Sequence, residues 1–291
     1  MLIRANLLLL LTSVIWGFGF IAQRLGMDYI GPYSFNFFRF ALGALSLVPL
    51  VYFLERKKSG QAKAGRPFWV IGGLAGLVLF GGATLQQVGL LYTTAGKAGF
   101  ITGLYLVIVP LIGFCLRQKI DKLTVAGALV ATYGLYLLSI TEGFNIGQGD
   151  TLVLIGAFFW AVHVQVVGYA AKYKLDPLKL AILQYLICAG LNLVLALILE
   201  ELSFQATLDA SGAILYAGLV SVGIAYTLQI VAQKHVDPSQ AAILLSLEAV
   251  FAVLAGWLML DELLNSRESW GCILMFAGMM LSQMPGLQKK K

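Results

Sequence analysis

Charged residues are scarce in this sequence. Asp, Glu, Lys and Arg together make up 12% of the 291 residues, whereas hydrophobic residues make up 59%. Water-soluble domains usually carry about 25% charged residues, so the composition excludes an ordinary soluble domain and favours an integral membrane protein. The net charge of +6 does not indicate a nucleic-acid partner, because the basic residues lie between apolar runs rather than along one face.

Residues that build metal sites and catalytic centres are also rare. The chain has two histidines, and its three cysteines have no paired spacing: Cys115, Cys188 and Cys272. There is no H-E-x-x-H and no G-x-S-x-G motif, and "AGKA" at 95–98 is not a phosphate-binding loop because Ala98 stands where Ser or Thr is needed. The sequence therefore predicts no disulfide framework, no metal, no cofactor, no ATP hydrolysis and no enzyme. An intramembrane lipid-modifying enzyme is the alternative from a different class, and it lacks a visible catalytic set.

Long apolar runs, by contrast, are abundant. A membrane-spanning helix needs about 20 mostly apolar residues. Ten segments meet this requirement, so we expect an all-α membrane protein with ten transmembrane helices, at about 5–24, 33–54, 69–92, 97–116, 123–140, 150–171, 178–199, 212–233, 239–260 and 270–285. The first segment resembles a signal peptide but has no A-x-A-like cleavage site, so we expect it to be retained.

The basic residues are distributed unevenly between the loops. With the N-terminus inside, sixteen of the twenty Lys and Arg residues fall in inside loops or at the termini, three fall outside, and Arg39 lies within a span. Cytoplasmic loops carry an excess of Lys and Arg. The sequence therefore predicts that both termini are cytoplasmic, most simply in a bacterial inner membrane.

The two halves of the chain resemble each other. "IWGFGFIAQRLGMDYIGPYSFNFFRF" aligns with "FWAVHVQVVGYAAKYKLDPLKLAILQY" after one gap, which pairs Trp16 with Trp160. "GLVLFGGATLQQ" at 76–87 aligns with "GLVSVGIAYTLQ" at 218–229, which pairs Gln87 with Gln229. Each half holds five spans, an odd number, so the second half must enter the membrane from the opposite side. The sequence predicts two inverted five-helix repeats, 1–145 and 146–291, an architecture of many secondary transporters.

Three stretches carry a resemblance to a known family: "VIWGFGFIAQR" at 14–24, "TTAGKAGFITGLYLVIVPL" at 93–111 and "LLSLEAVFAVLAGWLMLDELL" at 244–264. Together with the ten spans they resemble the drug/metabolite transporter superfamily, EamA type, over essentially the whole chain. The resemblance implies a central cavity between the repeats and the export of small metabolites, amino acids among them.

Polar side chains within spans usually face the interior of the helix bundle. On this basis the candidate pathway residues, apart from one glutamate, are Arg39, His163, Gln87, Gln229, Tyr226, Thr84, Trp16 and Trp160. The glutamines also suit hydrogen bonds between helices, and the tryptophans suit packing. His163 suits a buried neutral histidine as well as a proton carrier, and Arg39 either snorkels or pairs with an anionic group. Lys97, at the outer end of its span, is expected to snorkel, with gating as the alternative.

The remaining candidate is Glu248, within the otherwise apolar run "LLSLEAVFAVLAGWLML" at 244–260. It lies about nine residues, roughly 14 Å, from the start of its span, which is close to the membrane midplane. A carboxyl group there is a functional candidate by default. It can exchange a proton or bind a substrate ammonium group, and the alternative is a structural carboxyl group that caps a helix break or bonds to a neighbouring helix.

The sequence as a whole predicts a secondary transporter that exports small metabolites, amino acids or similar amphipathic solutes, by alternating access. Proton coupling is left open, and a facilitative importer or exchanger is the alternative. The expected partners are a small-molecule substrate and the lipid bilayer, with protons if transport is coupled, and we expect a monomer.

Overall fold

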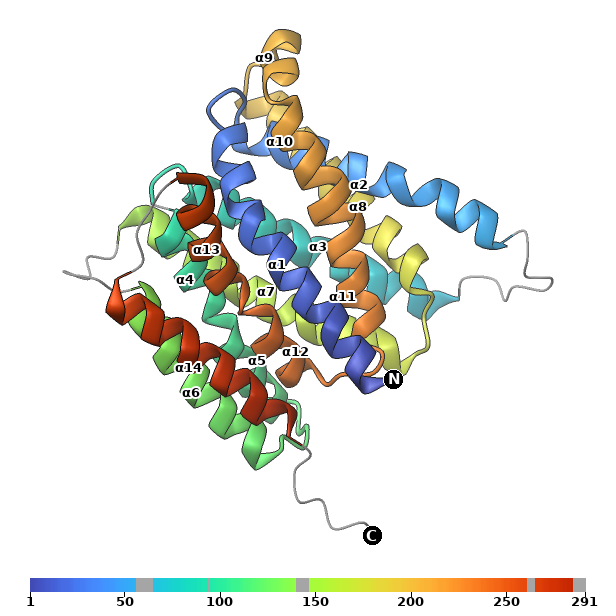
Figure 1. Cartoon of the computed structure of the whole chain (residues 1–291). Coiled ribbons are helices and arrows are strands. Elements are labelled where there is room, and N and C mark those ends of the chain that lie inside the picture. The colour runs from blue at the N-terminus through green and yellow to red at the C-terminus, as the bar shows by residue number, and fades with distance from the viewer. Residues whose placement is uncertain (56–64, 94, 140–146, 261–264, 285–291) are drawn as a thin grey trace.

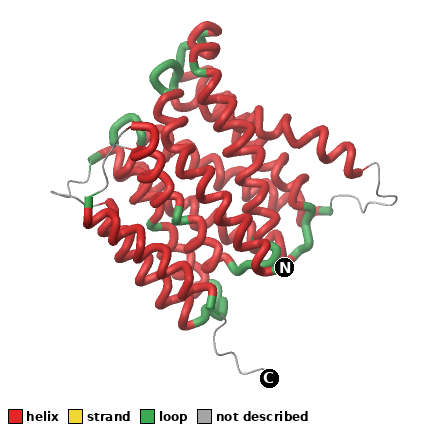
Figure 2. The backbone as a smooth tube through the Cα atoms, viewed as in Figure 1, coloured by secondary structure: helices red, strands yellow, loops and turns green. Residues whose placement is uncertain are grey.

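A computed structural model describes residues 1–55, 65–93, 95–139, 147–260 and 265–284. Within these ranges all regular secondary structure is helical and there is no strand (Figures 1 and 2). The elements are α1 (Leu2–Gly26), α2 (Pro32–Glu55), α3 (Arg66–Gly89), α4 (Ala95–Gly103), α5 (Tyr105–Cys115), α6 (Lys122–Ser139), α7 (Gln148–Lys172), α8 (Pro177–Leu199), α9 (Phe204–Asp209), α10 (Ser211–Leu215), the π-helix η1 (Tyr216–Tyr226), α11 (Thr227–Ala232), α12 (Pro238–Leu245), α13 (Glu248–Leu260) and α14 (Ser266–Gln283).

Eight helical stretches in the described part of the chain are long and apolar enough to cross a membrane. They are Leu2–Gly26, Pro32–Phe53, Arg66–Gly89, Lys97–Cys115, Gln148–Lys172, Pro177–Leu199, Ser211–Ala232 and Pro238–Ala255. This confirms the prediction of an all-helical, multi-pass membrane protein. The predicted spans at 123–140 and 270–285 correspond to α6 and α14, which are helical but do not belong to these eight.

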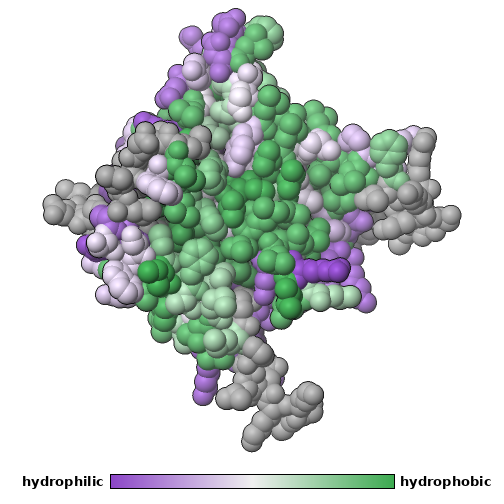
Figure 3. All heavy atoms as spheres, viewed as in Figure 1, coloured by the Kyte–Doolittle hydropathy of each residue, from purple (hydrophilic) through white to green (hydrophobic). Residues whose placement is uncertain are grey.

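The outer surface of the bundle is apolar, as contact with lipid requires. In the view of Figure 3, apolar side chains cover the middle of the face and polar side chains gather around its periphery. Leu7 and Leu11 of α1 and Leu219 and Ile224 of η1 are exposed large hydrophobic residues. Lipid replaces water around such side chains, so their exposure carries no penalty in a bilayer.

Helix ends are fixed by proline and acidic side chains. Proline occupies the first position of α2, α8 and α12, where its missing amide hydrogen has no helical partner. The Glu200 carboxylate, just after α8, accepts hydrogen bonds from the Tyr33 and Ser34 amides at 2.8 Å each. It therefore caps α2 and complements the positive end of its dipole.

Two predicted spans are interrupted in the middle. The fourth is divided into α4 and α5 at Leu104, and the ninth into α12 and α13 at Ser246 and Leu247. Each second piece begins with a polar residue, Tyr105 in α5 and Glu248 in α13. Non-helical backbone at membrane depth is tolerated only where protein or a cavity surrounds it, so both breaks must lie in the interior.

Helices α6 and α14 pack through glycine. A Cβ atom on Gly134 would lie 2.7 Å from the carbonyl oxygen of Gly271, and one on Gly127 would lie 2.5 Å from that of Gly278. The pairing of low with high numbers means that the two helices are antiparallel. Because the backbones are this close, no larger residue fits at Gly127, Gly134 or Gly278 without moving a helix.

We predict that Gly134→Ala destabilises the protein, by about 1–3 kcal/mol, because the new methyl group meets backbone rather than a flexible side chain. Thermal unfolding in detergent measures this as a melting temperature lower by several degrees. The control is Gly190→Ala, since a Cβ atom on Gly190 meets nothing within 4 Å. Equal melting temperatures for the two variants would contradict the close approach of α6 and α14.

Candidate functional site

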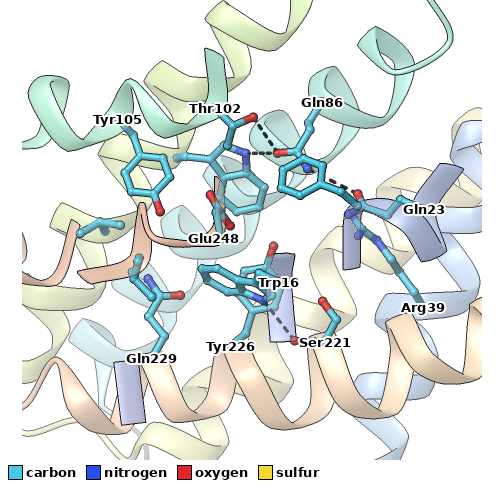
Figure 4. Close-up of a pocket in the computed structure, with 14 residues that line it drawn as sticks. Trp16, Gln23, Arg39, Gln86, Thr102, Tyr105, Ser221, Tyr226, Gln229 and Glu248 are labelled. Atoms are coloured by element: carbon cyan, nitrogen blue, oxygen red, sulfur yellow. Dashed lines mark hydrogen bonds between the residues drawn. The ribbon is translucent and has the colours of Figure 1, made fainter. Parts of the chain in front are cut away.

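A small cavity lies at the centre of the bundle, bounded by helices from both halves of the chain (Figure 4). Its volume is about 30 Å³, enough for about one water molecule. The polar residues that line it are Gln23, Arg39, Gln86, Thr102, Ser221, Gln229 and Glu248, and the aromatic ones are Trp16, Phe20, Tyr105, Trp160 and Tyr226. A solute larger than water therefore enters only if the surrounding helices separate.

Aromatic rings form one wall of this cavity. The Tyr226 ring lies 4.5 Å from that of Trp16 and is stacked on that of Trp160 at 5.9 Å, centroid to centroid. Trp16 comes from α1 and Trp160 from α7, so the Tyr226 ring at the end of η1 joins the two halves. Ring pairs in this range are mutually stabilising and present flat apolar faces.

A chain of hydrogen bonds centred on Gln86 forms the opposite wall. The side-chain oxygen of Gln86 accepts from Trp160 Nε1 at 2.8 Å and from Thr102 Oγ1 at 3.4 Å. Its side-chain nitrogen donates to Gln23 Oε1 at 3.4 Å, and Gln23 Nε2 donates to the carbonyl of Gly19 at 3.2 Å. Because these residues belong to α7, α4, α3 and α1, the network fixes four helices around the cavity.

The second half contributes a shorter network. Gln229 Nε2 donates to Gln233 Oε1 at 3.0 Å, and Gln233 Nε2 donates to the carbonyl of Val164 at 2.9 Å. The side-chain oxygen of Gln229 is buried and has no hydrogen-bond partner among the described residues. It is therefore an acceptor that is available to a donor in the cavity.

The two charged residues of the lining are almost fully buried. Glu248 is 4% exposed and begins α13, directly after the break in its span. Arg39 is 2% exposed and reaches the cavity from α2. The structure thus brings together six of the predicted pathway residues: Trp16, Arg39, Trp160, Tyr226, Gln229 and Glu248.

The other three predicted residues lie outside the cavity lining. Thr84 Oγ1 donates to Asn192 Oδ1 at 3.0 Å, and Gln87 Nε2 donates to the carbonyl of Gln23 at 3.5 Å. His163 Nε2 is 3.0 Å from Gln184 Oε1. All three side chains tie neighbouring helices together, and their roles in transport stay predictions.

Several lining residues were not singled out as site candidates from the sequence. Gln23 lies on the face that Trp16 defines, and Gln86 adjoins Gln87, so helical spacing carried a signal for both. Thr102, Tyr105 and Ser221 carried no such signal. Thr102 and Tyr105 lie on either side of the break at Leu104, and both line the cavity.

The two ends of the bundle differ. At the end that the charge count predicts to be outside, Lys97 Nζ lies 2.6 Å from Asp150 Oδ2, and Thr93 Oγ1 donates to the other carboxylate oxygen at 2.6 Å. At the opposite end a cavity of about 1390 Å³ lies between the starts of α1, α3 and α12 and the ends of α5 and α7. Its lining includes Gln118, Lys172 and Gln240.

The model of one transporter family matches this chain twice, at residues 3–140 and 147–284. The chain belongs to the EamA-like transporter family. The EamA-like resemblance seen in the sequence is thereby confirmed, and the protein is a transporter of this family. Two curated proteins similar to it are named as transporters as well.

An "Uncharacterized transporter" of Archaeoglobus fulgidus is 32% identical over 95% of this EamA-like chain and 85% of its own length. The "Uncharacterized transporter YoaV" of Bacillus subtilis is 25% identical over 97% of both chains. A solved crystal structure with 18% sequence identity matches 99% of this chain and 98% of its own at a TM-score of 0.80. This last similarity shows that the fold is shared.

We predict that a cysteine at position 229 reacts with a small methanethiosulfonate reagent at least about tenfold faster than one at position 87, because thiol reactivity requires access. Both side chains are buried, but Gln229 lines the cavity, whereas Gln87 lies outside its lining and packs against α1. The variants are made in a background that lacks Cys115, Cys188 and Cys272, and mass spectrometry follows labelling. Equal rates would mean that the cavity is not the water-accessible path.

Proposed function

We propose that this protein is a secondary transporter that exports small metabolites across a bacterial inner membrane by alternating access. The observation that carries the proposal is Glu248, a buried carboxyl group at a helix break that faces a cavity shared by both halves. Amino acids or similar amphipathic solutes suit the mixture of amides and rings in the lining. Glu248 is the group through which protons are coupled to transport.

The proposed architecture is ten spans in two inverted repeats, 1–145 and 146–291, with both termini cytoplasmic. The double match to the family model supports the division. The glycine contacts between α6 and α14 support the inversion. An offset of 144 positions pairs Gly127 with Gly271 and Gly134 with Gly278. When each residue is replaced by its counterpart in the other half, the contact Gly127–Gly278 becomes the contact Gly271–Gly134, which is also present.

A second pair of contacts behaves in the same way. A Cβ atom on Gly76 of α3 would meet Ile187 of α8 at 2.7 Å, and one on Gly218 of η1 would meet Leu42 of α2 at 2.7 Å. Gly76 aligns with Gly218, and Leu42 aligns with Ile187 at the offset of 145 that pairs Pro32 with Pro177. The interrupted spans also correspond, because Tyr105 and Glu248 begin equivalent helix pieces.

Alternating access requires that one end of the path is closed when the other is open. The Lys97–Asp150 ion pair and its Thr93 hydrogen bond hold α4 against α7 at the proposed outer end. Tyr105 and Glu248 differ by 143 positions, and the same offset pairs Lys97 with Gln240. Gln240 lines the cavity of about 1390 Å³ at the other end. The ion pair at one end and the large cavity at the other support a state that is closed to the outside. If each half adopted the arrangement that the other half has here, the site would open outward.

The proposal assigns no chemistry to the protein beyond movement of the solute. A lipid-modifying enzyme would convert its substrate in detergent solution, whereas a transporter needs a sealed compartment to act. The protein is proposed to act as a monomer, because both halves of the site are present in one chain.

We predict that Glu248→Gln lowers efflux of radiolabelled amino acids from proteoliposomes about tenfold or more, equivalent to ~1.4 kcal/mol in the transport barrier. The substitution keeps shape and hydrogen bonding but removes the titratable proton. Folding should be unchanged, as judged by melting temperature. Glu201→Gln, at an exposed position after α8, is the control. Full efflux by Glu248→Gln would rule out a proton or charge role, and loss of folded protein would indicate a structural one.

We also predict that Lys97→Gln opens the outer end. A cysteine at position 229 should then react with a membrane-impermeant thiol reagent applied from outside roughly threefold faster or more, as expected for loss of a partly exposed ion pair. Asp150 keeps its hydrogen bonds from Thr93 and from the Gly147 amide, so the start of α7 is preserved. Lys234→Gln, at an exposed position, is the control. An unchanged rate would show that Lys97 does not close the path.

A further inference from the structure

Arg39 is a buried cation with two side-chain nitrogens that form no hydrogen bond within the described part of the chain. Its side chain is 2% exposed and lines the central cavity from α2, close to Gln23 in the view of Figure 4. Nε and Nη2 are buried and make no hydrogen bond to any described residue. Buried donors are nearly always paired, so a guanidinium group with two unpaired nitrogens requires an explanation.

Among the described residues, Arg39 contacts aromatic rings and forms no ion pair. The guanidinium carbon lies 4.9 Å from the centre of the Phe40 ring and 5.9 Å from that of Phe35. Its electrostatic neighbours are the Tyr226 hydroxyl and the Cys188 thiol, and groups of these types are ordinarily neutral at pH 7. Within the described residues the ion pair found is Lys97–Asp150, so Arg39 and Glu248 share a cavity without forming one.

A structural role does not account for this arrangement. Arginine near a helix end can extend to the membrane surface, but the low exposure of Arg39 shows that it does not. Cation–π contacts stabilise such a charge only in part. An unpaired charge in the membrane interior costs stability, which is why such residues mark substrate or ion paths.

We propose that the Arg39 guanidinium binds a carboxylate group of the transported solute. The inference rests on the proposed function and identifies the chemical class of its solute. A carboxylate matches the planar donor fork of arginine with two parallel hydrogen bonds. Arg39 is the one cation in the described lining and Glu248 is an acid, so a group with a single negative charge is favoured over a phosphate dianion.

The first test uses the purified protein without solute. Replacement of Arg39 by the apolar residue of similar length, Arg39→Met, should raise the melting temperature, because an unpaired buried charge is removed. Arg24→Met is the matched control: Arg24 Nη1 donates to the carbonyl of Leu90 at 2.9 Å, so its loss should not stabilise the protein. A lower melting temperature for Arg39→Met would show that Arg39 holds the fold together, and it would overturn the proposal.

The second test measures binding to matched acids and amides. The probes are 3-phenylpropionate and its amide, L-phenylalanine and its amide, and phenyl phosphate. Each is added at increasing concentration, and the melting temperature of the protein is measured. For the wild type, the carboxylates should stabilise the protein at concentrations at least about tenfold below those of the amides, because a charge-assisted bidentate contact is lost in the amide. Arg39→Met should abolish this difference, and Arg39→Lys should retain part of it.

The outcomes separate this inference from the proposed function. Equal stabilisation by acids and amides, no stabilisation by any carboxylate, or a stronger effect of phenyl phosphate would each refute the assignment of Arg39. Carboxylate binding through Arg39 without efflux from proteoliposomes would refute transport and leave the assignment intact. Efflux of acid and amide at equal rates by both the wild type and Arg39→Met would refute the assignment and leave transport intact.

Discussion

Lipid offers no hydrogen-bond partner, and this constraint decides where the polar parts of the chain lie. A helix satisfies its own backbone, so most spans are continuous and face lipid with apolar side chains. The two interrupted spans break this rule at Leu104 and at Ser246–Leu247. Both second pieces begin with a residue that lines the central cavity, Tyr105 and Glu248. The helix breaks and the polar side chains therefore lie together, because both must be kept away from lipid.

Glycine determines how closely the helices approach that interior. At Gly76, Gly127, Gly134 and Gly218 a single added carbon would meet a neighbouring helix at 2.7 Å or less. In lipid, such contacts replace the hydrophobic effect as a source of helix association. Contacts this close occur between α3 and α8, between α2 and η1 and between α6 and α14, and also between α3 and α7, where a Cβ atom on Gly89 would lie 2.6 Å from Val153. The described lining of the cavity contains aromatic rings and amide side chains and no glycine.

Much of the fold was predictable from the sequence, because apolar runs of membrane length and helical periodicity are strong signals. Part of the aromatic wall carried a signal, since Trp16 and Trp160 recur under the repeat alignment, whereas Tyr226 is paired there with Thr84. The helix breaks were not predictable. "LLSLEAV" carries no proline or glycine, and the interruption before Glu248 depends on packing that only the folded bundle supplies. Thr102 and Tyr105, beside the other break at Leu104, were missed as well. Gln87 and Gln86 differ by one position, and helical periodicity alone does not decide which of two adjacent amides faces the cavity.

The contact between α6 and α14 is self-complementary. Each helix contributes two glycines seven residues apart, and the first glycine of each helix meets the second glycine of the other. Contacts of this kind are what two identical chains make across a two-fold axis. The α6–α14 contact in this chain has this form, with Gly127 and Gly134 on one helix and Gly271 and Gly278 on the other. One chain therefore carries both surfaces of this contact, so the two are always present in a one-to-one ratio. Tyr105 and Glu248 each begin the second piece of an interrupted span but differ in chemistry, so the cavity that both line is not symmetric.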